Sequence, residues 1–171
     1  MKMTTVIATN NYVMTGSNVL NLRLCKDIDV ICYEKDILVS VTGDEYIKSA
    51  VVDGKKYEFL LADNQESLQW ILEHKNELTP YEIAYICKYG HIHIAGKQKK
   101  KWRKHIQDYH FLKLLVDIEK PLVKEGMKLH RKTTNERVRQ RTPRLKGVEK
   151  EDFFEDLEKK FIDHDLIHEE V

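Results

Sequence analysis

The sequence has no run of eighteen apolar residues, so it provides no candidate for a membrane-spanning helix. Its N-terminal residues are too polar for a secretory signal. Cysteine is scarce: Cys25, Cys32 and Cys87 lie in apolar surroundings without CxxC spacing, which predicts small buried side chains in a reducing compartment. No internal repeat is present. These absences predict a soluble, cytoplasmic protein with no membrane partner.

The chain also lacks an excess of charge of either sign, because its net charge is +1 over 171 residues. The charges are nevertheless segregated. Lys97 to Lys104 contains six basic residues in eight, and Lys128 to Lys146 contains eight Lys or Arg with Glu136 as the one acid. From Glu149 to the end, ten acidic residues accompany three lysines. This pattern predicts a polyanion-binding surface beside a solvated acidic segment.

Short apolar runs in the first third of the chain predict a small mixed sheet. We expect strands over 30–32, 37–41 and 55–62, and a tight turn at Asp53-Gly54 before the last of them. Residues 45–51 are expected to form a short helix that crosses between strands. The fold class predicted for this part is α/β.

Beyond residue 63 the apolar residues recur at helical spacing. A helix is expected to begin near residues 64–67, and a second at Thr79, with Pro80 in the first turn and Glu82 closing a capping box. Residues 91–94 are expected to form a loop or edge strand. A longer helix is predicted over 102–119 and is expected to end or kink at Pro121.

The last part of the chain is expected to be less regular. Residues 131–146 show little apolar periodicity, which predicts a loop, and helical spacing returns over 151–167. The predicted domains are therefore an α/β core over residues 1–63, a helical subdomain over 64–125, and a basic segment with an acidic C-terminal helix over 126–171.

A pair of carboxylates marks the most informative stretch of the sequence. Asp27 and Asp29 are two residues apart in an expected strand, so they project from the same face. Two carboxylates on one face repel each other unless a cation lies between them, and Mg²⁺ prefers such hard oxygen ligands. Gly16-Ser17 precedes the pair by nine residues; Gly16 lets the backbone approach a phosphate, and the Ser17 hydroxyl can donate to it.

A third acid, Glu58, lies between Tyr57 and Phe59 in the last expected strand. Its aromatic neighbours should point to the opposite, core-packed side, so Glu58 points either to solvent or to a site. Beside Asp27 and Asp29 it would complete a set of three carboxylates, which can hold two metals about 3.5–4 Å apart for an in-line phosphoryl displacement.

The sequence resembles the motif of the polymerase-β-like nucleotidyltransferase superfamily: it has Gly16-Ser17, then Asp27-Ile28-Asp29-Val30, then Glu58 on an expected strand. The resemblance implies an α/β nucleotidyltransferase core followed by helices, with Mg²⁺ or Mn²⁺ as cofactor. It implies transfer of a nucleoside monophosphate from a nucleoside triphosphate to a hydroxyl, with pyrophosphate released. Asp27, Asp29 and Glu58 would be the catalytic metal ligands, and Gly16 and Ser17 would hold the triphosphate. The spacing before Asp27 is short for this superfamily, and its third acid is more commonly Asp.

The basic segments supply further candidates. Lys104, together with Lys101, is expected to reach the triphosphate, with Asp108 orienting Lys104 from one turn away; a solvated basic face is the alternative. The acceptor is expected to be RNA, tRNA in particular, with a small molecule or a protein hydroxyl as the alternatives. The alternative use of the second basic segment is to bind the acidic tail. The candidate nucleic-acid-binding residues are Lys99, Lys100, Arg103, Arg131, Lys132, Arg137, Arg139 and Arg141.

Two other interpretations compete with the enzymatic one. A protein that keeps this fold without activity could act as a nucleic-acid-binding or regulatory module. His164 and His168, at i,i+4 spacing, could bind metal or belong to an HD-type site, although acidic helix ends that carry histidine are common. The segments 142–145, 150–154 and 163–165 resemble uncharacterised phage-encoded proteins, which implies no function.

Overall fold

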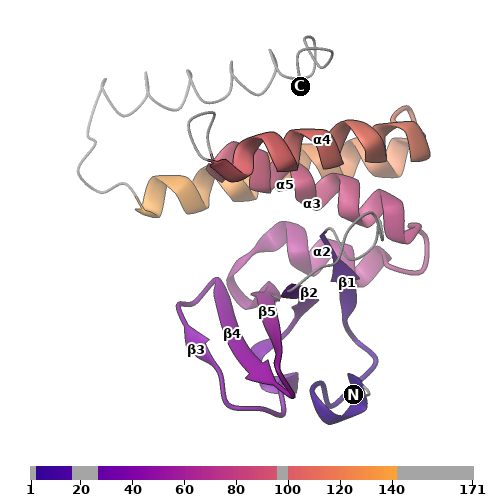
Figure 1. The fold of residues 1–171 in the computed structure, drawn as a ribbon. Coiled ribbons are helices and arrows are strands. Elements are labelled where there is room, and N and C mark those ends of the chain that lie inside the picture. The colour runs from indigo at the N-terminus through magenta and orange to yellow at the C-terminus, as the bar shows by residue number, and fades with distance from the viewer. Residues whose placement is uncertain (1–2, 17–26, 96–99, 142–171) are drawn as a thin grey trace.

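The computed structural model describes residues 3–16, 27–95 and 100–141, which form a mixed α/β fold (Figure 1). Five strands make one sheet, and a layer of helices lies against one of its faces. The mixed α/β class expected from the sequence is therefore confirmed. The strands are β1 (Val13–Thr15), β2 (Asp27–Cys32), β3 (Thr42–Gly43), β4 (Ile47–Val52) and β5 (Lys55–Leu61).

The sheet has the strand order β1-β2-β5-β4-β3. β2 and β5 are parallel neighbours at its centre, whereas β1 pairs with β2, and β4 with both β5 and β3, in antiparallel fashion. Short 3₁₀ turns occur at η1 (Met3–Thr5), η2 (Glu34–Asp36) and η3 (Ala62–Asn64). The centre of the sheet is thus built from two segments about thirty residues apart in the chain.

The two faces of the sheet bury different clusters. Tyr57, Phe59 and Leu61 of β5 pack with Val30 and other residues on the face away from the helices. Ile31 and Leu60 belong to the larger core that the helices cover. Because side chains alternate along a strand, Asp29 and Glu58 lie on the helix-covered face. The expectation that Tyr57 and Phe59 point away from Glu58 is confirmed.

Four helices follow the sheet: α2 (Glu66–His74), α3 (Pro80–Ala95), α4 (Lys100–Leu115) and α5 (Pro121–Arg141). In Figure 1, α3, α4 and α5 form a layer, and α2 lies between that layer and the sheet. Their apolar residues, Leu68, Ile71, Ile86, Leu112 and Val123 among them, are buried in the shared core. No helix in the described ranges is long and apolar enough to cross a membrane.

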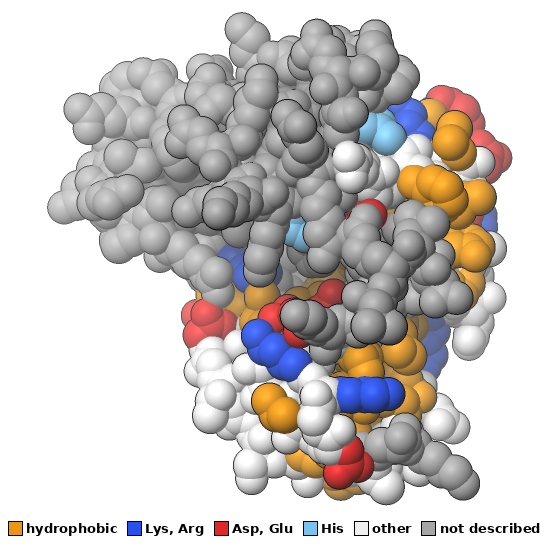
Figure 2. Space-filling model, viewed as in Figure 1, with side chains coloured by type: hydrophobic (Ala, Val, Ile, Leu, Met, Phe, Trp, Pro, Cys, Tyr) orange, Lys and Arg blue, Asp and Glu red, His pale blue; other side chains and the backbone are white. Residues whose placement is uncertain are grey.

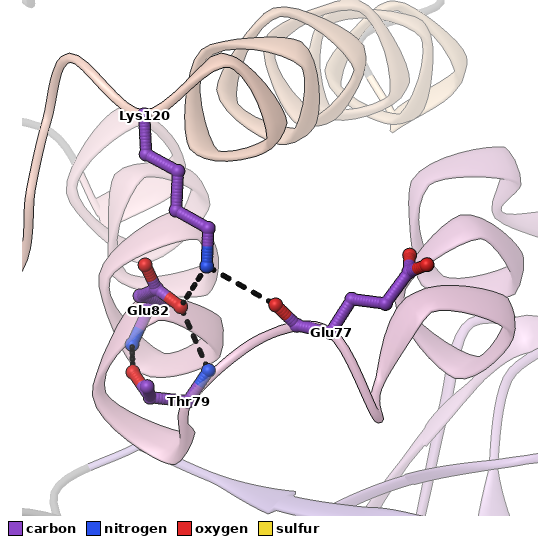
Figure 3. Close-up of polar contacts among 4 residues, drawn as sticks. All are labelled: Glu77, Thr79, Glu82 and Lys120. Carbon is purple, nitrogen blue, oxygen red and sulfur yellow. Dashed lines mark hydrogen bonds and ion pairs between the residues drawn. The ribbon is translucent and has the colours of Figure 1, made fainter.

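The start of α3 confirms the predicted capping box (Figure 3). The backbone N–H of Thr79 donates to Glu82 Oε1 at 2.8 Å, and the N–H of Glu82 donates to Thr79 Oγ1 at 3.1 Å. Lys120, just before α5, donates to Glu82 Oε1 at 3.0 Å and to the carbonyl of Glu77 at 3.1 Å. The capping box therefore also joins the start of α3 to the turn between α4 and α5.

The Asp53-Gly54 turn is likewise confirmed. Both residues have positive φ, 52° and 78°, which is the requirement of a two-residue type I′ hairpin turn. This turn joins β4 to β5, so the expected helix over 45–51 is wrong. Residues Ile47, Val51 and Val52 favour a strand, and pairing with β5 along its length decides the outcome.

Other local expectations are also corrected. Residues 37–41 do not form a strand. The pairing in this segment is an isolated bridge between Ile37 and Ile7. Residues 91–94 continue α3 rather than forming a loop or edge strand. The glycine that suggested a break, Gly90, lies where α3 meets α5, and a Cβ there would be 2.4 Å from His130 Nε2.

The C-terminal helices differ from expectation at their ends. α4 ends at Leu115, and Pro121 is the first residue of α5, a position that tolerates proline because its missing N–H would have no partner within the helix. The loop expected over 131–146 is wrong as far as Arg141, because α5 continues to that residue. The expected helix over 151–167 lies outside the described residues. α5 also runs through the expected domain boundary at 125/126.

Candidate functional site

Strand pairing brings two of the three predicted carboxylates, Asp29 and Glu58, to one place on the sheet. In the parallel pair β2–β5, Asp29 is the register partner of Glu58, and Asp27 is the register partner of Lys56. On the other side of β2, Thr15 of β1 is opposite Asp29. Three segments that are distant in sequence therefore meet around Asp29, on the face that the helices cover.

The carboxyl groups of Asp29 and Glu58 share a hydrogen bond, which needs a proton between them. The pKa of Asp29 is raised from 3.8 to about 7. Burial is the largest cause, the charge of Glu58, this hydrogen bond and the charge of Asp27 act in the same direction, and Lys88 acts in the opposite direction. The described residues around the group thus balance only part of its negative charge.

Gly16, at the end of β1, lies directly against Asp29. Its φ is +76°, and a Cβ at this position would be 2.3 Å from Asp29 Oδ2. Only glycine lets the backbone adopt this conformation and approach the carboxylate so closely. Gly16, Asp29 and Glu58 are therefore brought together as expected, whereas Ser17 lies outside the described residues.

The fit of this group to a divalent cation depends on how many ligands the protein must supply. Among the described residues, no three His, Cys, Asp or Glu side chains form a group ready to hold a metal ion. Asp29 and Glu58 nevertheless offer adjacent carboxylate oxygens in a place where negative charge is unfavourable. Mg²⁺ commonly takes one or two carboxylates and completes its shell with water and substrate phosphates. The pair fits that pattern, and Asp27 is close enough to affect the pKa of Asp29.

Two lysines that the sequence reasoning missed lie at this site. Lys56 Nζ is 3.4 Å from Glu58 Oε1, with about half of its side chain exposed. Lys88 of α3 has a side chain only 1% exposed; its Nζ is 3.2 Å from Asp108 Oδ2, also 1% exposed, and 3.3 Å from His105 Nδ1. Lys88 directly follows the apolar run 83–87, and this position is the sequence signal that could have identified it as a buried lysine.

Asp108 has a described partner on α3 that the sequence did not predict. Asp108 accepts a hydrogen bond from Lys88, and its burial removes it from direct contact with a nucleotide. The side chains of Lys101 and Lys104, like those of Lys100 and Arg103, lie outside the described part of the structure, although all four residues are in the first turns of α4. The expected contact between Lys104 and Asp108 therefore stays a prediction.

The candidate nucleic-acid residues on α5 have different surroundings. Lys132 is exposed, with its Nζ 3.9 Å from Glu66 Oε2. Arg137 packs over the ring of Tyr46, with Cζ 5.6 Å from the centroid, and donates to Gln65 Oε1 at 3.5 Å. Arg131 is half-buried. Arg137 thus helps join α5 to the sheet. Lys99 and the side chains of Arg139 and Arg141 lie outside the described residues.

The other titratable candidates fall into two groups. Cys32 and Cys87 are buried free thiols, as expected, and burial raises the pKa of each to about 12. Cys25, together with His164 and His168, lies outside the described residues.

The close contact at Gly16 predicts a specific effect of substitution. Gly16→Ala should displace the Asp29 carboxylate and lower the free energy of unfolding by more than the ~1 kcal/mol expected for the backbone alone. Gly54→Ala is a matched control, because Gly54 has φ +78° but nothing within 4 Å of a Cβ. Urea unfolding of both variants measures the difference. Equal losses would contradict the proposed contact.

The buried ion pair predicts a second outcome. Lys88→Met should lower the free energy of unfolding by about 3–5 kcal/mol, because it removes the ammonium group that pairs with the buried Asp108 carboxylate. Lys88→Met/Asp108→Leu should recover most of that loss. Lys124→Met, which breaks an exposed pair with Glu119, is the control and should change stability by less than about 1 kcal/mol. A double variant as unstable as Lys88→Met alone would contradict this account.

The raised pKa of Asp29 predicts that stability depends on pH. Protonation of Asp29 contributes to the free energy of unfolding. This contribution is fully present below pH 3.8 and is lost as the pH rises through about 7. Asp29→Asn mimics the protonated form, so in metal-free buffer well above pH 7 it should be more stable than wild type by roughly 1–3 kcal/mol. Unfolding curves of both proteins across this pH range test it. A difference that does not change with pH would contradict it.

Comparison with known proteins places the chain in a family. Residues 83–171 match the family model described as "Domain of unknown function (DUF7275)". The matched segment covers just over half of the chain, from the first turn of α3 to the C-terminus. No curated protein and no solved structure matches the chain. The chain belongs to the family described as domain of unknown function DUF7275.

Proposed function

We propose that this protein is a metal-dependent nucleotidyltransferase that moves a nucleoside monophosphate from a nucleoside triphosphate to a hydroxyl acceptor. One observation carries the proposal: the carboxyl groups of Asp29 and Glu58 meet beside the backbone of Gly16. The resemblance of the Gly16-Ser17, Asp27-Ile28-Asp29 and Glu58 motif to polymerase-β-like nucleotidyltransferases supports the same chemistry, and the mixed sheet is consistent with such a core.

Asp29 and Glu58, with Asp27, would hold Mg²⁺ or Mn²⁺. When bound, the cation neutralises the carboxylates and the phosphate charge that develops during transfer. Gly16 has no side chain, so its backbone can lie close to the triphosphate. Lys56, at the exposed edge of the site, adds a positive charge near the same phosphates.

In the proposed reaction the acceptor oxygen forms a bond to the α-phosphorus, and the bond from that phosphorus to the bridging oxygen of pyrophosphate breaks. The acceptor loses its proton, for which the Glu58 carboxylate is the nearest described base, and pyrophosphate leaves with the bridging electron pair. The Lys88–Asp108 ion pair joins α3 to α4 beside the site, and both of its side chains are buried.

We propose RNA, with tRNA as the first example, as the acceptor. The support is the basic composition of residues 97–104 and 128–146. The described part of α5 gives this proposal less support than the sequence does, because Arg137 contacts Gln65 and Tyr46 rather than facing outward. Lys132 is the exposed candidate in that part of the helix.

Calorimetric titration of the full chain with each of the four nucleoside triphosphates tests the proposal. One triphosphate should bind in the presence of Mg²⁺ but not in its absence. Asp29→Asn should weaken that binding at least about tenfold, because it removes a charged ligand. Asp53→Asn is the matched control: Asp53 is an exposed residue of the β4–β5 turn, where asparagine is also favoured, so its affinity should equal that of wild type.

Absence of binding by all four triphosphates in Mg²⁺ and in Mn²⁺ would contradict the enzymatic proposal. That result would favour the alternative of a nucleic-acid-binding or regulatory module. Equal binding by wild type and Asp29→Asn would instead show that the triphosphate binds somewhere other than the carboxylate pair.

A further inference from the structure

A buried hydroxyl group without a hydrogen-bond partner lies next to the carboxylate pair. Thr15 is the last residue of β1, and its side chain is completely buried. Within the described part of the chain, its oxygen Oγ1 has no hydrogen-bond partner. Burying a hydroxyl in this way is unfavourable, and native structures contain few such groups. The packing of the core alone therefore does not explain why this position carries a hydroxyl.

Strand pairing places Thr15 beside Asp29. The two residues are directly opposite each other in the antiparallel pair β1–β2, an arrangement in which Cβ atoms are about 4.5–5.5 Å apart. Val13, two residues earlier on the same face of β1, packs against the core that the helices cover. The side chain of Thr15 therefore lies on the helix-covered face of the sheet, as that of Asp29 does.

The Asp29 carboxylate has an oxygen on the side of β1. Its Oδ2 lies so close to the backbone of Gly16 that a Cβ there would be 2.3 Å away, and Gly16 directly follows Thr15 in the chain. Glu58, which shares a hydrogen bond with Asp29, is instead on β5, at the other side of β2. Rotation about the Cα–Cβ bond of Thr15 moves its hydroxyl between staggered positions without any change in the backbone. The hydroxyl can thus turn toward Oδ2.

The other polar neighbour of Thr15 is a weaker acceptor. Cys87 is buried on α3, which packs on β1. Burial raises the pKa of its thiol to about 12, while the adjacent Thr15 hydroxyl acts in the opposite direction. Cys87 is therefore a neutral thiol near pH 7, and a neutral thiol accepts hydrogen bonds less well than a carboxylate does. Asp29 is the stronger acceptor on this face.

Solvent reaches the carboxylates but not the hydroxyl. Asp29 is half-buried, and the side chain of Glu58 is 33% exposed. Figure 2 shows acidic and basic side chains next to each other at the surface near the level where the sheet meets the helices in Figure 1. A cation can therefore approach the carboxylates from solvent. Thr15, being completely buried, can act on such a cation through Asp29 but not by direct contact.

We propose that Thr15 is a positioning residue whose hydroxyl donates a hydrogen bond to Asp29 Oδ2 when a divalent cation is bound. Contacts with the cation then replace the hydrogen bond between Asp29 and Glu58, and the hydroxyl holds the Asp29 carboxylate from the side of β1. Hydrogen-bond donors that orient metal-binding side chains in this way are common around metal sites. The inference rests on the proposed function, because it concerns the cation that the proposed reaction needs.

Titration of the full chain with Mn²⁺ alone, with the free ion measured by EPR, tests this role. Thr15→Val keeps the shape of the side chain but removes the hydroxyl, so it should weaken Mn²⁺ binding about tenfold or more. Thr15→Ser keeps the hydroxyl and should retain the affinity of wild type. Thr42→Val, at an exposed position of β3, is the matched control and should also retain it.

Urea unfolding in metal-free buffer separates a positioning role from a structural one. Thr15→Val should be at least as stable as wild type there, because the hydroxyl that it removes has no described hydrogen-bond partner in the metal-free protein. A residue that supports only the fold would lose stability and Mn²⁺ affinity together. The expected combination is therefore weaker Mn²⁺ binding without loss of stability.

Three results would overturn the proposal. In the first, wild type binds Mn²⁺ and Asp29→Asn weakens that binding, but Thr15→Val binds as wild type does; the cation site then stands without a role for Thr15. In the second, Thr15→Val loses both affinity and metal-free stability, which makes its role structural. The third is absence of Mn²⁺ binding by wild type, which would contradict the proposed function together with this inference.

Discussion

The parallel pairing of β2 with β5 is the constraint on which the rest of this structure depends. It sets Asp29 directly beside Glu58, and the alternation of side chains along both strands turns the two carboxylates toward the helices. A shift of β5 by one residue in this register would move Glu58 to the face opposite Asp29 and bring Tyr57 and Phe59 to the site. The packing of those two aromatic residues in the second core therefore also fixes the position of the carboxylates.

Holding the carboxylates in this way destabilises the fold, and neighbouring groups offset only part of the effect. Burial and the charge of Glu58 raise the pKa of Asp29 to about 7, while the ammonium of Lys88 acts against that rise. Lys88 is itself buried and is balanced by Asp108 of the next helix. Gly16 has no side chain, which allows its backbone to approach Asp29 closely. Local features that lower stability while surrounding a pair of acids are expected at a functional site rather than in an ordinary core.

Several of these features could be predicted from the sequence because they depend on local chemistry. The Thr79–Glu82 capping box, the Asp53-Gly54 turn and the orientation of Glu58 away from Tyr57 and Phe59 each follow from side-chain spacing over a few residues. The predictions that proved wrong concern elements whose structure depends on residues distant in the sequence. β4 is a strand because β5 pairs with it, and α3 continues through Gly90 because α5 packs there. The Lys88–Asp108 pair joins two helices, so neither residue alone identified its partner.

Crystals of the full chain grown with Mn²⁺ and a non-hydrolysable nucleoside triphosphate provide the most direct test of the central claim that Asp29 and Glu58 bind a divalent cation. Anomalous scattering from Mn²⁺ gives the position of the metal ion directly. The account predicts an anomalous peak within about 2–2.5 Å of carboxylate oxygens of both Asp29 and Glu58, with the phosphates on the side of Gly16. A structure with the triphosphate bound and the metal peak elsewhere, with Asp29 and Glu58 still joined by their hydrogen bond, would contradict it.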